Sequence, residues 1–82
     1  MSHADEVREY VIRTYVEPAR KRGAKTVQVR AGEVHKALGF KQRTALVCSA
    51  LGALRFRDQC GVKLVSREGP GVGMTTLFTF EL

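Results

Sequence analysis

Hydrophobic residues recur along this chain at two spacings, one typical of helices and one typical of strands. Over residues 7–19, apolar side chains return every three or four positions, which predicts an amphipathic helix. Ser2 and Asp5 have the spacing of a capping box at its start. Because Pro18 lacks a backbone N–H, the helix is expected to end or kink near residues 16–17, or to continue briefly with Pro18 in a new first turn.

Alternation of apolar and polar residues predicts three short strands, at 26–30, 62–67 and 75–82. In the first strand, Val27 and Val29 are expected to face inward, and in the last, Phe78 and Phe80 are expected to be buried. In the middle strand, the side opposite the apolar residues carries Lys63, Val65 and Arg67. The glycine-rich segment 68–73 would join the last two strands as a hairpin.

The most informative pattern lies within residues 34–54. Val34 and Leu38 form a short apolar face, which Gly39 and Phe40 interrupt. After the interruption, the helical spacing returns with Val47, Ala50, Leu51 and Leu54. Two short helices joined by a glycine-containing turn are typical of a helix-turn-helix.

The two helices are expected at 33–38 and from about Gln42 or Arg43 to Leu54 or Phe56. The second helix would then open with Lys41, Gln42 and Arg43. Those are the positions at which the second helix of such a motif meets nucleic acid.

Net charge is distributed unevenly along the chain. The total is +6, but residues 18–67 hold twelve Lys and Arg against two acidic residues, which gives +10. The segments on either side, 1–17 and 68–82, each carry −2. A basic middle favours a surface for a polyanion, because each neutralised phosphate releases counterions. The alternative is the solvated surface of a generally basic protein.

Composition narrows the class of protein further. Hydrophobic residues make up 44% of the 82 residues and charged residues 27%, as in soluble globular proteins. No apolar run approaches the roughly 20 residues that span a bilayer, and the polar, acidic start is unlike a secretory signal. Cys48 and Cys60 have no metal-binding spacing, so reduced thiols and a cytoplasmic location are expected. We expect one domain, residues 1–82, small enough for dimerisation to be plausible.

The predicted order is helix, strand, helix, helix, strand, loop, strand, an α+β arrangement. In this order, and in the pattern of Val34, Leu38, Gly39, Val47, Leu51 and Leu54, the chain resembles the winged helix-turn-helix family of DNA-binding domains. Small archaeal and bacterial regulators are the nearest likeness. The resemblance implies three helices, a short strand and a C-terminal β-hairpin wing at 62–82. It makes 42–54 the recognition helix and 69–73 the tip of the wing. In the commonest bacterial pattern the first apolar residue of that helix lies about two positions nearer the glycine than Val47 does, which favours a longer turn here.

The outward face of the predicted recognition helix has few groups that read bases. If Val47, Leu51 and Leu54 point inward, the opposite face carries Ala45, Ser49, Gly52 and Phe56. Arg reads guanine and Gln reads adenine in the major groove, so Gln42 and Arg43 are the candidates for base contacts. Lys41 and Thr44 are candidates for phosphate contacts. The small residues elsewhere would let the helix approach DNA closely, or approach another protein through Leu46, Ser49 and Ala53.

Other basic residues could add phosphate contacts around this helix. The full set of expected DNA-binding residues is Lys41, Gln42, Arg43, Thr44, Ser49, Arg20, Arg22, Lys25, Arg30, Lys36, Arg55, Lys63 and Arg67. Each has a structural alternative: Arg55 and Arg57 can instead complement the negative end of a helix dipole, and Lys63 and Arg67 can belong to a solvated hairpin.

No combination of residues predicts catalysis, so the chain is not expected to be an enzyme. The loop with Gly69 and Gly73 is not followed by Gly-Lys-Ser/Thr or a helix, which argues against a mononucleotide site. Cys48 is expected to be a buried apolar residue. His35 is expected at the surface or on a phosphate, and no metal, cofactor or small-molecule substrate is indicated.

The sequence therefore predicts a cytoplasmic protein that binds double-stranded DNA, as a transcriptional regulator or a chromatin-associated protein. Two alternatives stay open: a winged-helix module for protein interaction, as a homodimer or a subunit of a complex, and RNA binding.

Overall fold

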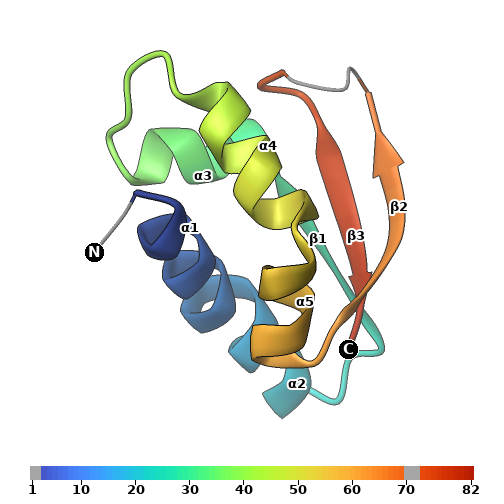
Figure 1. The fold of residues 1–82 in the computed structure, drawn as a ribbon. Coiled ribbons are helices and arrows are strands. Elements are labelled where there is room, and N and C mark those ends of the chain that lie inside the picture. The colour runs from blue at the N-terminus through green and yellow to red at the C-terminus, as the bar shows by residue number, and fades with distance from the viewer. Residues whose placement is uncertain (1–2, 70–72) are drawn as a thin grey trace.

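The computed structural model describes residues 3–69 and 73–82 and shows helices packed against one three-stranded antiparallel sheet (Figure 1). The chain begins with a continuous helical run, which comprises α1 (His3–Val11), η1 (Ile12–Val16) and α2 (Glu17–Lys21). The elements that follow are β1 (Thr26–Arg30), α3 (Ala31–Ala37), α4 (Thr44–Gly52), α5 (Leu54–Cys60), β2 (Lys63–Glu68) and β3 (Leu77–Glu81). The predicted α+β class is confirmed.

The first helix continues through Pro18 because the turn before the proline is widened. η1 is a π-helix, in which the Glu17 N–H bonds to the Ile12 carbonyl five residues earlier. Pro18 then lies at the start of α2, where a missing N–H is tolerated. The expected short continuation is therefore correct. Ser2, the expected cap of this run, lies outside the described residues.

The sheet has the strand order β1-β3-β2, so the last strand lies in the middle. On the face toward the helices, Val29 and its partner Phe78 are fully buried, as is Phe80. On the other face, Thr26, Gln28 and Arg30 are exposed. The predicted alternation of 26–30 and 75–82 is thus confirmed.

A β-bulge changes the facing of β2. Leu64 pairs with Phe80, but Ser66, not Val65, pairs with the next residue of β3. Arg67 therefore lies opposite Phe78, on the face that the helices cover, because cross-strand partners share a face. The expectation that Arg67 shares the outer side with Lys63 is wrong, since alternation does not continue across the extra residue.

The predicted helix 42–54 is also wrong in its bounds. α4 begins at Thr44 and ends at Gly52, and Ala53 is extended (φ −77°, ψ 144°) before α5 begins at Leu54. Because helical periodicity does not carry across an extended residue, the facing of the following side chains is reset. Leu54, expected inside, is 67% exposed, whereas Phe56, expected outside, is fully buried.

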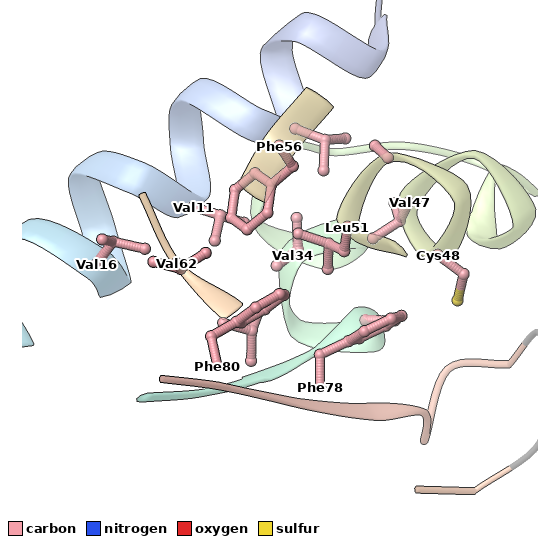
Figure 2. Packing of buried hydrophobic residues seen from close by; sticks show 14 of the residues in the cluster. Val11, Val16, Val34, Val47, Cys48, Leu51, Phe56, Val62, Phe78 and Phe80 are labelled. Atoms are coloured by element: carbon pink, nitrogen blue, oxygen red, sulfur yellow. The ribbon is translucent and has the colours of Figure 1, made fainter. Parts of the chain in front are cut away.

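The core lies between the helices and the covered face of the sheet (Figure 2). Phe78 and Phe80 project from the sheet toward Leu51 and Phe56, and the rings of Phe56 and Phe80 have their centroids 5.1 Å apart. Cys48 is buried at 1% exposure, as predicted. This core fixes α4 against the sheet. The segment that precedes α4 is therefore fixed at the end that joins it to α4.

Candidate nucleic-acid interface

The α3–α4 turn, residues 39–43, presents three polar side chains at the entry to α4. Gly39 and Gln42 both have positive φ, 68° and 53°, which reverses the chain in a short space. Positive φ is uncommon for a residue other than glycine and is associated with functional turns. Lys41, Gln42 and Arg43 are all exposed. They precede the helix, which begins at Thr44, so the expectation that they open it is wrong.

His35, near the end of α3, fixes the backbone of this turn through two hydrogen bonds. Its Nε2 atom accepts a hydrogen bond from the backbone N–H of Arg43 at 3.1 Å, and its carbonyl accepts one from the Phe40 N–H, also at 3.1 Å. The rings of His35 and Phe40 meet edge to face, with centroids 6.0 Å apart. His35 is only 8% exposed, so its expected place at the surface is wrong. Nothing in the sequence predicted this role, because the bond joins a residue of α3 to a residue eight positions later, across an irregular turn.

The part of the β2–β3 loop that directly precedes β3, residues 73–76, lies beside the first turns of α4 and is called the hairpin base below. The Thr44 hydroxyl donates to the Met74 sulfur at 3.2 Å, and the Cys48 thiol lies 3.9 Å from the Gly73 carbonyl oxygen. Ala45 and Ser49 remain exposed on α4. The structure therefore brings the turn, the start of α4 and the hairpin base together. Residues 70–72 of the expected wing tip lie outside the described residues.

Arg67 fills the space beside Gly52 that the sequence suggested was open. Its guanidinium lies 5.0 Å from the centroid of the Phe78 ring, and its Nη1 atom is 3.4 Å from where a Cβ of residue 52 would be. Gly52 thus accommodates a side chain from β2. Arg67 therefore connects the hairpin to α4. It does not lie on the outer side of the hairpin, as the alternation of β2 predicted.

Two further arginines bind the ends of helices. The Arg20 guanidinium donates to the carbonyls of Cys60 and Gly61, at 2.5 and 3.1 Å, where α5 ends. The Arg57 guanidinium donates to the Gly52 carbonyl at 3.0 Å, where α4 ends. Such contacts satisfy carbonyls that the helix itself leaves without partners.

The remaining expected residues are divided between the two ends of the sheet. At one end, Thr26, Glu81 and Lys63 lie side by side, and at the other, Arg30, Leu77 and Glu68 do. The five residues from Thr26 to Arg30 are four steps of a strand, which separate these ends by about 13 Å. The end with Arg30 also holds the α3–α4 turn and the hairpin base (Figure 1).

The exposed side chains of Arg22, Lys25 and Lys63 belong to the opposite end, where α2 and α5 also end (Figure 1). Lys36 is exposed on α3, one residue before its end, and Arg55 is exposed in the first turn of α5. The expected set is thus not one continuous patch. The structure brings Lys41, Gln42, Arg43 and Thr44 together and separates them from Arg20, Arg22, Lys25 and Lys63.

The Cys60 thiol is buried where α5 ends. Burial raises the pKa of the Cys60 thiol, and this outweighs the opposite influence of the nearby Arg20 guanidinium. The thiol is therefore protonated at neutral pH. Within the described residues, no three His, Cys, Asp or Glu side chains gather as metal ligands. The helices of the described ranges are also too short or too polar to cross a bilayer.

Comparisons of this chain with protein families, with curated proteins and with solved structures found no match in any of the three.

Proposed function

We propose that this chain is a winged-helix domain that binds double-stranded DNA through the α3–α4 turn and the start of α4. One observation carries the proposal: Lys41, Gln42 and Arg43 are all exposed in a turn that is fixed at the entry to a helix without any acidic residue. The strand order β1-β3-β2 and the hairpin beside α4 fit the arrangement of a winged helix.

The proposed mechanism follows from the chemistry of these side chains. Arg43 and Gln42 reach base edges in the major groove, where Arg pairs with guanine and Gln with adenine. Lys41 and the hydroxyl of Thr44 contact phosphates and set the orientation of α4. With two candidates for base contacts, sequence specificity is modest, unless a second copy of the domain reads a second half-site.

Duplex affinity measured against salt concentration tests the proposal. Fluorescence anisotropy of a labelled duplex should give log K falling linearly with log salt, with a slope of about −0.9 per phosphate contacted. Lys41→Ala should lower affinity and reduce the steepness of the slope by about one phosphate. Lys21→Ala is the matched control, because Lys21 is an exposed lysine at the opposite end of the domain.

Absence of duplex binding at low salt would overturn the proposal. An equal effect of the two lysine substitutions would show that binding depends on net charge and not on the α3–α4 turn. RNA of the same sequence as the duplex distinguishes the two nucleic acids, because the wide, shallow minor groove of A-form RNA is recognised by shape and by its 2′-hydroxyls. The proposed protein is cytoplasmic and acts as a transcriptional regulator or a chromatin-associated protein. Either role requires that it bind the duplex in this assay.

One observation favours a protein interface as a second candidate. The outward face of α4 carries the small exposed residues Ala45 and Ser49, and Leu54 follows at 67% exposure. Ser49→Arg separates the two candidates when the oligomeric state is measured by light scattering. Loss of an oligomer with duplex binding intact would make this face a protein interface, whereas loss of duplex binding alone supports the DNA proposal.

A further inference from the structure

His35 is a buried titratable group that lies directly under the α3–α4 turn. Its Nε2 atom accepts the hydrogen bond from the Arg43 N–H, so in the neutral ring the proton is on Nδ1. A protonated imidazole carries hydrogen on both nitrogens and can accept no such bond. The contact with Arg43 therefore exists only while His35 is neutral.

The Arg43 N–H that bonds to His35 lies at the entry to α4. Arg43 is the N-cap residue of α4, and its own side chain makes no capping hydrogen bond. Arginine is not among the residues that cap helices well. Gln42, just before it, has the unfavourable positive φ of 53°. An acceptor that fixes the Arg43 N–H thus offsets strain in the residues that present the proposed DNA contacts.

Aromatic packing keeps the imidazole in one orientation. Phe40 lies against His35 with ring centroids 6.0 Å apart, and His3 lies against the same phenylalanine at 5.4 Å. His3 is half-exposed and pairs with Glu6 at 3.4 Å, so it is a separate titratable group. Rotation of the His35 ring to offer Nδ1 would disturb this stack.

We infer that His35 is a positioning residue for DNA binding, and that its protonation releases Arg43 and weakens binding in acid. This inference depends on the proposed function for its effect on DNA. The expected fall in duplex affinity on protonation is unusual, because an added positive charge normally strengthens binding to a polyanion. Loss of affinity on acidification would therefore report the broken hydrogen bond and not the change in charge.

The charges near His35 do not supply another acceptor for Arg43. The charged and titratable groups on the elements packed around it are His3, Asp5, Glu6, Arg8, Glu9, Tyr10, Arg30, Glu33, Lys36, Lys41 and Arg43, together with the buried Cys48 thiol of α4. Of the acidic ones, Asp5 pairs with Arg8 and Glu6 with His3. Glu9 pairs with Arg13. Glu33 is exposed in the first turn of α3.

Two substitutions of His35 separate the acceptor from the titration. His35→Gln places an amide oxygen near the position of Nε2, so it retains an acceptor that does not titrate. His35→Leu fills the site without an acceptor. In a His3→Gln background, which removes the other histidine, the parent should lose about fivefold in duplex affinity at constant salt between neutral pH and an acidic pH at which NMR shows the His35 ring protonated. The Gln variant should bind equally well at the two pH values, and the Leu variant should bind weakly at both.

A measurement without DNA keeps the inference independent of the proposed function. In NMR spectra, the Arg43 amide proton should shift with the same midpoint as the His35 ring and should exchange faster with solvent below it. If the amide follows His35 but no duplex binds, the inference about the turn is supported and the proposed function fails. If the amide ignores the titration of His35, or if the Gln variant has the same pH profile as its parent, the inference is overturned, whether or not the Leu variant folds.

Discussion

Both ends of the sheet carry basic residues, but these residues make different contacts at the two ends. At the end where α2 and α5 finish, the Arg20 guanidinium is bound to the carbonyls of Cys60 and Gly61. At the other end, Lys41, Gln42 and Arg43 project from a turn whose backbone is held by His35. A basic side chain that donates hydrogen bonds to the last carbonyls of a helix stabilises the fold. The distribution of charge along the sequence therefore does not identify the residues that can contact a ligand.

The largest effect on stability should come from a backbone clash at the end of the sheet that holds the α3–α4 turn. Gly32 donates its N–H to the Met74 carbonyl at 2.9 Å, and a Cβ at residue 32 would lie inside contact distance of that carbonyl oxygen. Gly32→Ala should therefore lower the free energy of unfolding by about 2–3 kcal/mol, as overpacking does. Urea denaturation measures this loss. Unchanged stability would mean that the hairpin base moves away from α3 at little cost.

The next largest effect concerns binding and compares two arginines from the two ends. Arg43→Ala retains the backbone N–H that His35 binds but removes the guanidinium, and it should cost about 1–3 kcal/mol of duplex binding. Arg22→Ala, an exposed arginine at the end of α2, should cost clearly less. Anisotropy titrations at one salt concentration compare them. Equal losses would remove the functional distinction between the two ends.

Arg20 should affect the opposite property. Arg20→Met retains much of the side-chain length but loses both hydrogen bonds to the end of α5. Because Arg20 is exposed, the free energy of unfolding should fall by only about 1 kcal/mol. Duplex affinity of the folded protein should not change. Thermal unfolding and anisotropy on the same sample check both statements, and a loss of affinity without a loss of stability would assign Arg20 to the DNA interface.

Gly52→Ala should have the smallest effect and serves as the control for Gly32→Ala. A Cβ here would lie 3.4 Å from the Nη1 atom of Arg67, at the flexible end of a side chain that can adjust. Alanine also favours a helix over glycine, so the two contributions oppose each other. The free energy of unfolding should stay within about 0.5 kcal/mol of the parent. A larger loss in urea denaturation would show that Arg67 holds β2 rigidly against α4.

Several features of the fold were predictable from local pattern. Alternation placed Val29, Phe78 and Phe80 in the core, because successive side chains of a strand face opposite sides. Helical spacing placed Val47 and Leu51 there in the same way. The glycine after Leu38 indicated a turn before the next helix. Each of these depends on neighbours within a few residues.

The tertiary structure decided the facing of Arg67, Leu54 and Phe56, because a bulge in β2 and an extended residue at Ala53 reset the periodicity on which the predictions depended. It also decided which basic residues lie together and which bind helix ends, since such contacts join positions as far apart as Arg20 and Cys60. The sequence by itself determined most of the core, a basic middle segment and the order of elements, except that it predicted three helices and did not separate α5 from α4. Only the tertiary structure placed His35 beneath Arg43, because that hydrogen bond forms once the chain reverses at residues 39–43.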